Sequence, residues 1–350
     1  MSSDQYHAGA LMRAGQPRER RYRFRKALWF TLGLIAVGGW LTNHAAAAER
    51  AQDYPNRPIR LIVPQTAGSA IDTLGRILAV KMGEALGQQF VVDNRAGAGG
   101  LVGMEIGKNA LPDGYTLTIS STSGLTIVPH LHKKIPYDSL KDFEFISIYA
   151  AQPNILVVNQ AQPPKSVKEF IEWAKSKGNQ LNMASAGVGS TSHFSGTAFM
   201  MAANLQSTHV PYKGGGPSVA AVVAGEAHWT LTPAAAVMSL VRAGRLRALG
   251  HSLPKRARLL GDLPAIAETL PGFENVAETG LIAPRGTPRP ILDKLRITLV
   301  KVVDSPEIEA LFAEQGVLAA TSTPEEFRKI TQRQLLRSGE IVRAVGLKAE

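Results

Sequence analysis

Three short loops in this sequence combine small and hydroxyl-bearing residues in a way that suits anion binding. They read TAGSA at 66–70, ASAGVGST at 184–191 and KGGGPS at 213–218. Each follows a strand-like run and precedes a helix-like run, and the first four N–H groups of a helix have no partner inside it. The helix dipole adds partial positive charge at that end, and small residues let a ligand reach the backbone. The loops therefore predict an anion site built from main-chain donors, with Lys213 adding a cation.

The same loops fit a plainer interpretation, in which they are tight turns with ordinary helix caps. A single loop of this kind is more often a cap than a ligand site. Because the pattern recurs at three corresponding strand ends, we keep both interpretations open.

Asp72 raises a similar question, because it stands in the first turn of the helix that follows the first loop. A carboxylate there complements the helix dipole and can cap its own helix. It could instead bind an ammonium group of a ligand. We favour the structural role and keep the residue as a candidate.

Motifs for reactive chemistry are missing from the sequence. The chain has no Cys, which excludes disulfides, thiolate metal sites and a cysteine nucleophile. The run GAGGLVG at 97–103 misses the dinucleotide fingerprint because its third Gly falls one residue late, and KGGG places Lys before the glycines, unlike a P-loop. His130 and His132 flank Leu131 as they would on one strand face, but no third metal ligand accompanies them. We predict no metal and no cofactor.

The N-terminus has the pattern of a secretory signal peptide at 1–48. Basic residues at 18–26 precede an apolar run at 27–41, and HAAAA at 44–48 offers small residues for cleavage. A membrane anchor is the alternative, but a span needs about 20 apolar residues and this run is shorter. We expect a free, monomeric protein in the periplasm. The net charge of +11 falls to 11 − 5 = +6 without residues 1–48, and this modest basic excess could steer anionic small molecules. No basic block of the remaining chain is interleaved with aromatics, so we do not expect nucleic-acid binding.

The remaining sequence alternates strand-like and helix-like stretches, which predicts an α/β protein with a mostly parallel sheet covered by helices. Two apolar stretches, at 145–159 and 278–288, are long enough to cross between domains. We predict a discontinuous first domain at 49–151 plus 277–350, and an inserted second domain at 152–276.

Seven motifs follow one another between residue 54 and the C-terminus: VPQTAGSAID, VDNRAGAGGLVGMEIGKNALPDGYTL, IPYDSLKDF, LNMASAGVGSTSHF, HVPYKGGGPSVAAVVAGE, VRAGRLRALG and GLIAPRGTP. With these motifs in this order, the chain resembles the Bug-type extracytoplasmic solute receptors, the substrate-binding components of tripartite tricarboxylate transporters. The resemblance implies a two-lobed, periplasmic binding protein-like (type II) fold that closes about a hinge on a small organic anion. It also implies that loops 66–69 and 185–191 hold a ligand carboxylate, and that the receptor serves a permease with a large and a small subunit.

Three departures from the family pattern leave the ligand open. Gln65 replaces an aromatic residue, Ser69 follows Gly68 where the family has a second Gly, and His228–Trp229 replaces a family Asp. The first two changes make the site more polar, and Trp229 could supply an aromatic wall. The full set of predicted ligand-binding residues is Thr66, Ala67, Gly68, Ser69, Asp72, Ser121, Thr122, Ser185, Ala186, Gly187, Gly189, Ser190, Thr191, Lys213, Gly214 and Trp229.

The leading hypothesis is a non-catalytic periplasmic solute-binding protein that captures a small carboxylate and delivers it to the tripartite transporter. A periplasmic sensory receptor would use the same cleft with a signalling partner, and sequence does not separate these two roles. An exported α/β enzyme is a third hypothesis, but it would need a nucleophile and a base in the cleft, and no such pair is legible.

Overall fold

Strand β4 (Phe143–Asn159) is shared by the two halves of one mixed sheet. The computed structural model describes residues 53–344, so the predicted signal peptide at 1–48 lies outside the described residues. The strand order is β2-β1-β3-β9-β4-β7-β5-β6, with β10 and β8 also paired to β4. The other strands are β1 (Ile59–Val63), β2 (Phe90–Asn94), β3 (Thr116–Ser121), β5 (Asn182–Ser185), β6 (Thr208–Pro211), β7 (Trp229–Pro233), β8 (Leu246–His251), β9 (Val276–Pro284) and β10 (Leu318–Ala319).

The chain crosses between the halves along β4 and β9. These strands pair antiparallel as far as Pro153 and Val276, and from Asn154 onward β4 pairs with β7 instead. We call the half with β2, β1, β3, β9 and the start of β4 the first lobe, and the half with the end of β4, β7, β5, β6 and β8 the second lobe. The two crossings coincide with the apolar stretches that the sequence singled out. The exact domain boundaries at 151/152 and 276/277 stay a prediction.

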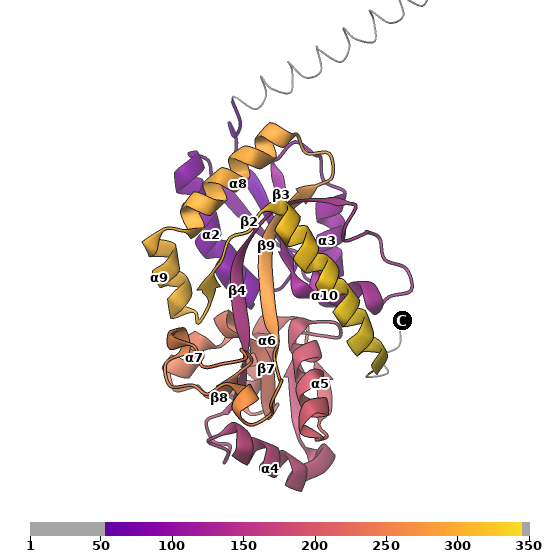
Figure 1. The fold of residues 1–350 in the computed structure, drawn as a ribbon, viewed down its shortest axis with the longest axis vertical. Helices are drawn as coiled ribbons and strands as arrows, with labels where there is room; N and C mark the ends of the chain where they lie inside the picture. The colour runs from indigo at the N-terminus through magenta and orange to yellow at the C-terminus, as the bar shows by residue number, and fades with distance from the viewer. Residues whose placement is uncertain (1–52, 345–350) are drawn as a thin grey trace, which may run out of the picture. The chain divides into compact units, whose positions relative to one another are not determined.

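Helices pack on the sheet in both lobes (Figure 1). In the first lobe α8 and α10 pack on β4, and α2 contacts α8. The α-helices are α2 (Ala70–Leu86), α3 (Leu101–Lys108), α4 (Val167–Lys177), α5 (Thr191–Ala203), α6 (Gly215–Ala224), α7 (Met238–Arg242), α8 (Arg289–Val303), α9 (Pro306–Glu314) and α10 (Pro324–Ala344). The short helical turns are η1 (Ala98–Gly100), η2 (Ser123–Ile127), η3 (Val128–His130), η4 (Gly178–Gln180), η5 (Ala234–Ala236), η6 (Arg258–Leu260) and η7 (Ile266–Glu268).

The sheet is less parallel than the sequence predicted. Strands β1, β2 and β3 run parallel, as do β5, β6 and β7, but every pairing of β4 and β9 is antiparallel. The difference arises because β4 carries the chain from the first lobe to the second and β9 carries it back, so the two crossing strands run in opposite directions. The expectation of a strand at 130–132 is also wrong, since His130 ends η3 and its Nε2 lies 2.7 Å from the Leu335 carbonyl oxygen.

Trp229 belongs to the core of the second lobe, which corrects its prediction as an aromatic wall of the site. Its side chain is fully buried and meets the rings of Phe170 and Phe199 edge-on or tilted, at 5.3 and 5.9 Å between centroids. The indole N–H donates to Ser207 Oγ at 3.0 Å. Trp229 opens β7, and successive strand side chains point to opposite faces, so its ring takes the face covered by α4 and α5.

We predict that Trp229→Ala destabilises the protein by about 3–5 kcal/mol, because it removes a large side chain from a packed core and leaves a cavity. Thermal or urea unfolding of the unliganded protein measures the loss. Trp173→Ala is the matched control, since Trp173 is only partly buried against the same cluster and should cost less. A Trp229 variant with unchanged stability and lost ligand affinity would contradict this placement.

Candidate ligand-binding site

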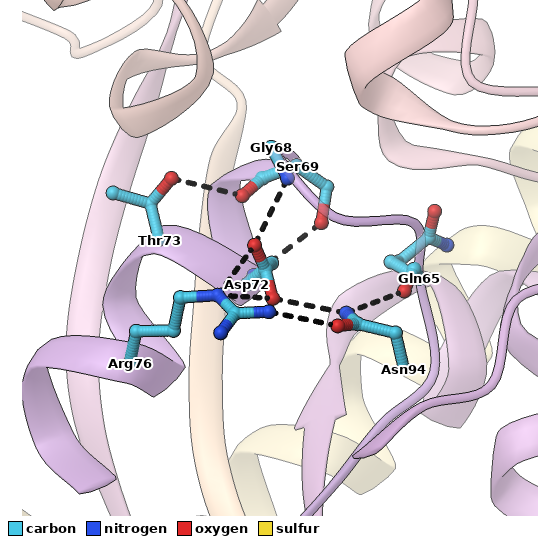
Figure 2. Close-up of polar contacts among 7 residues, drawn as sticks. All are labelled: Gln65, Gly68, Ser69, Asp72, Thr73, Arg76 and Asn94. Carbon is cyan, nitrogen blue, oxygen red and sulfur yellow. Dashed lines mark hydrogen bonds and ion pairs between the residues drawn. The ribbon is translucent and has the colours of Figure 1, made fainter. Parts of the chain in front are cut away.

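Hydrogen bonds to the Asp72 carboxylate hold the loop before α2 in place. The Asp72 carboxylate, 3% exposed as a residue, accepts the Gly68 N–H at 2.9 Å and Asn94 Nδ2 at 2.9 Å. Arg76 lies 3.0 Å from the same carboxylate and also donates to Asn94 (Figure 2). Asn94 in turn donates to the Gln65 carbonyl oxygen, so both ends of the loop are tied to one network. Asp72 lines neither cavity described below, and its acceptors serve the protein itself.

The helix caps leave selected main-chain donors free. Ser69 caps α2 by accepting the Asp72 N–H at 3.3 Å, and Ser190 caps α5 by accepting the His193 N–H at 3.2 Å. Within residues 53–344, the first two N–H groups of α2 and the first two of α5 have no hydrogen-bond partner. These are the amides of Ala70 and Ile71 in α2, and of Thr191 and Ser192 in α5. They are the donors that the helix dipole makes most attractive to an anion.

The loop before α5 consumes several of the donors that the sequence assigned to the ligand. Gly187 N–H donates to Ser185 Oγ, Gly189 N–H to His193 Nδ1, and Ala186 N–H to Ser192 Oγ. The prediction that this loop offers its own amides is therefore wrong at these three positions. The donors that remain free belong to the helix, not to the loop.

Three helix N-termini meet at one small cavity of about 50 Å³, which we call the inner cavity. Its walls include Ala70 and Ile71 of α2, Thr191 and Ser192 of α5, and Gly215 of α6. Hydroxyl groups complete the polar lining, and the remaining wall residues are Gln65, Ser69, Ser121, Ser123, Ala186, Ser190, Thr232, Pro233 and Ala236. The strands that precede these segments contribute their carboxyl ends, where ligands bind in open α/β sheets. A cavity needs about 10–15 Å³ to hold one water molecule, so a cavity of about 50 Å³ suits a carboxylate group rather than a whole organic acid.

The two lobes touch on both sides of the inner cavity. On one side Ser123 Oγ lies 2.7 Å from the carbonyl oxygens of Gly99, in the first lobe, and Gly189, in the second. On the other side a Cβ at Gly214, where φ is +121°, would lie 2.2 Å from Thr66 Oγ1. Only glycine permits this approach, and Thr66 Oγ1 is buried without a partner.

A second, larger cavity of about 860 Å³ adjoins the inner one and shares Gln65 and Ala186 with it. We call it the outer cavity. It is lined by small residues together with five basic or aromatic side chains that matter for charge, His132, His193, His209, Tyr212 and Lys213. Its other lining residues are Ala96, Gly97, Ala98, Gly99, Leu131, Gly187, Val188 and Gly214. Burial lowers the pKa of His193, and burial with the neighbouring His193 ring lowers the pKa of His209 to about 4.

The predicted site residues divide between the two cavities and their supports. Ser69, Ser121, Ala186, Ser190 and Thr191 line the inner cavity, and Gly187, Lys213 and Gly214 line the outer one. Six other predicted residues line neither cavity and instead form the loops and lobe contacts; they are Thr66, Ala67, Gly68, Asp72, Ser185 and Gly189. Thr122 lies elsewhere, beside the Glu278 carboxyl group, whose pKa burial raises. None of these placements tests binding itself, which stays a prediction.

Sequence reasoning missed several lining residues. Ala70 and Ile71 have apolar side chains and contribute through their backbone, and Ser123 and Thr232 stand in segments without a recognisable loop motif. Only the rule that ligands bind beyond strand carboxyl ends could have indicated Ser123, two residues after β3. Among the described residues, no cluster of three or more His, Cys, Asp or Glu could hold a metal ion.

Comparison with known proteins identifies the family. Residues 74–347 match the model of the tripartite tricarboxylate transporter family receptor. The chain belongs to this receptor family. BugT of Bordetella pertussis is 32% identical over 323 residues, which cover 90% of this chain and 98% of BugT. The match is to receptors, not enzymes, so the chain is a solute-binding protein.

Solved structures agree on the two-lobed, periplasmic binding protein-like fold. The periplasmic binding protein BugD is 29% identical with a TM-score of 0.81, covering 85% of this chain and all of BugD. Rpa4515 of R. palustris with adipate is 30% identical with a TM-score of 0.83, covering 85% of this chain and all of Rpa4515. MatC from Rhodopseudomonas palustris with bound malate is 30% identical with a TM-score of 0.77, covering 83% of this chain and all of MatC. Within residues 53–344 of this receptor, no helix is long and apolar enough to cross a membrane.

We predict that Asp72→Asn lowers the free energy of unfolding of the unliganded receptor by about 1–3 kcal/mol, because the new amide group faces donors and leaves one buried donor without an acceptor. Urea unfolding without ligand measures this loss. Arg76→Gln should cost less, since its half-exposed side chain leaves the Gly68 and Asn94 bonds in place. Unchanged stability with weakened ligand binding would instead assign Asp72 to the ligand.

Proposed function

We propose that this receptor captures a small organic carboxylate in the periplasm and delivers it to a tripartite transporter with a large and a small permease subunit. One observation carries the proposal: first-turn residues of α2, α5 and α6 line one inner cavity, and the N–H groups of Ala70, Ile71, Thr191 and Ser192 have no partner within residues 53–344. Carboxylates complement these partial positive charges without a charged side chain. The relatives that hold adipate and malate support the same ligand class.

The available donors are sufficient for useful affinity. Each hydrogen bond to a charged group contributes about 1.5–3 kcal/mol net, and a micromolar complex corresponds to about −8 kcal/mol. Four such bonds contribute about 6–12 kcal/mol before the cost of association, so other contacts of the ligand must offset that cost. The hydroxyl groups of the inner cavity can accept and donate further hydrogen bonds around the carboxylate.

Capture and lobe contact are coupled through the same donors. The amides of Ala70 and Ile71 come from the first lobe, and those of Thr191 and Ser192 come from the second. A ligand that contacts both sets binds the arrangement with touching lobes better than one with separated lobes. Only this difference in affinity can shift the equilibrium toward closure. A closed, loaded receptor is the form that a permease would recognise.

We predict that small mono- or dicarboxylates raise the melting temperature of the receptor, since binding to the native state stabilises it. A thermal-shift panel of adipate, malate, hexanoate, tricarboxylates, acidic amino acids and aromatic acids measures this, with nucleotides and sugars as controls. A shift produced only by nucleotides or sugars would refute the carboxylate proposal.

A more specific test removes one main-chain N–H group at a time. Thr191 is the first residue of α5, and the preceding Ser190 has φ −70° and ψ 159°, a conformation that suits a residue before proline. Thr191→Pro therefore removes one free N–H without breaking an intramolecular hydrogen bond. The same holds for Ala70→Pro, because Ser69 has φ −74° and ψ 162°.

We predict that either proline variant weakens binding of the most effective panel acid by about 10- to 100-fold, the equivalent of one charge-assisted hydrogen bond. Isothermal calorimetry measures the affinity, and circular dichroism checks the fold. Thr191→Ala is the control, because it removes the side chain but keeps the amide, and it should bind within a few-fold of the unchanged protein. Full affinity in both proline variants would exclude the main-chain donors as the binding groups.

A further inference from the structure

Two stacked histidines form one wall of the outer cavity. His193 comes from the first turn of α5 and His209 from β6, and their ring centroids lie 4.0 Å apart with an interplanar angle of 14°. Both residues line the outer cavity, next to the loop that separates it from the inner cavity. A ligand whose carboxylate occupies the inner cavity would extend past Gln65 and Ala186, which both cavities share, toward this pair.

The proton of His193 is fixed on one nitrogen. Its Nδ1 accepts the Gly189 N–H at 3.2 Å, so the neutral ring carries its hydrogen on Nε2. Protonation of Nδ1 would turn this acceptor into a donor facing another donor. His193 is therefore held neutral, and its Nε2–H has no partner among the described residues.

His209 has the opposite arrangement. Its Nε2 lies 2.6 Å from Ser185 Oγ, which donates to the Gly187 carbonyl oxygen at 3.3 Å and accepts the Gly187 N–H at 3.2 Å. We assign the single hydroxyl hydrogen of Ser185 to the Gly187 carbonyl oxygen, so that the remaining lone pair accepts from His209 Nε2–H. The Nδ1 atom of His209 is then left as a free acceptor, where a second proton can be added without breaking any bond.

The surroundings of the pair favour an anion. The other titratable or charged groups that line the outer cavity are His132, after η3, and Tyr212 and Lys213, between β6 and α6. None of the described lining residues is Asp or Glu. The pair is contacted by the neutral Ser185 of β5 and by the main-chain N–H of Gly189, in the loop before α5. Without ligand, the lowered pKa of both rings keeps them neutral at pH 7.

We infer that His209 takes up one proton from solution at Nδ1 when a ligand with a second anionic group at its far end enters the outer cavity, while His193 donates its Nε2–H to that group. The inference rests on the proposed function and specifies its ligand as a dianionic acid. Capture is then coupled to proton uptake, because the anion stabilises the imidazolium that the empty cavity disfavours.

The direction of the pH dependence follows from linkage. The pKa of His209 is about 4 in the empty receptor and rises when the anion binds, so the complex holds more protons than the free protein. In the pH range where the acid stays doubly ionised, affinity therefore falls as the pH rises toward the pKa of the complex, and it levels off above that pKa. The steepest change for one proton is about tenfold in Kd per pH unit.

Calorimetry with adipate near pH 6.5, in two buffers of different protonation enthalpy, measures protons taken up per ligand. We expect uptake of up to one proton with adipate and none with hexanoate, which has the same chain length and one carboxylate. His209→Gln should abolish uptake and weaken adipate at least fivefold at this pH, while it keeps a donor toward Ser185. His193→Asn retains an acceptor for Gly189, and it should weaken adipate but preserve uptake.

His228→Asn is the matched control, because His228 lies in the same lobe outside both cavities and accepts the Asn182 N–H through its ring. It should leave affinity and proton uptake unchanged. Adipate binding without uptake, uptake that persists in His209→Gln, or uptake lost in His132→Gln would each overturn the inference while the proposed function stands. If adipate gives no heat, the panel dicarboxylate with the largest thermal shift replaces it. If no carboxylate binds, both the inference and the proposed function fall.

Discussion

The proposed binding of an anion by this receptor depends on the unpaired N–H groups at the start of α2 and α5. A helix leaves its first donors without internal partners, and a serine cap satisfies the third while the first two remain free. Such groups are costly when buried and empty, so a cavity that collects them from two lobes favours an anion between the lobes. In the proposed function, the binding energy therefore comes from an ordinary property of helices, used at several places at once.

The rest of the site keeps these donors in place. Asp72, Asn94 and Arg76, none of which lines either cavity, hold the loop before α2 through their polar contacts (Figure 2). Ser185, Ser192 and His193 do the same for the loop before α5, because their side chains bind its internal amides. In both loops polar side chains face the loop itself, and the free amides face the cavity. This division explains how a site without a charged residue in its inner cavity can select a charged ligand.

The two cavities divide recognition into a general and a particular part. The inner cavity fits a carboxylate and is built from backbone donors and hydroxyl groups, which any organic acid could use. The outer cavity is much larger and carries the histidines, Tyr212 and Lys213, whose chemistry can distinguish one acid from another. In the proposed function, a ligand that spans both cavities lies beside the lobe contacts at Gly214, which lines the outer cavity, and at Ser123, which lines the inner one.

The sequence by itself determined the α/β class, the two crossings and the positions of the small-residue loops before α2, α5 and α6, because strand runs, caps and small-residue loops are local patterns. It also supported the family resemblance, which implied the receptor fold. Only the tertiary structure decided which amides are free, since Gly187 and Gly189 donate to side chains that fold back onto them. It likewise placed Trp229 in the core and Ser123 between the lobes. Those outcomes depend on packing between segments far apart in the chain, and no local pattern encodes them.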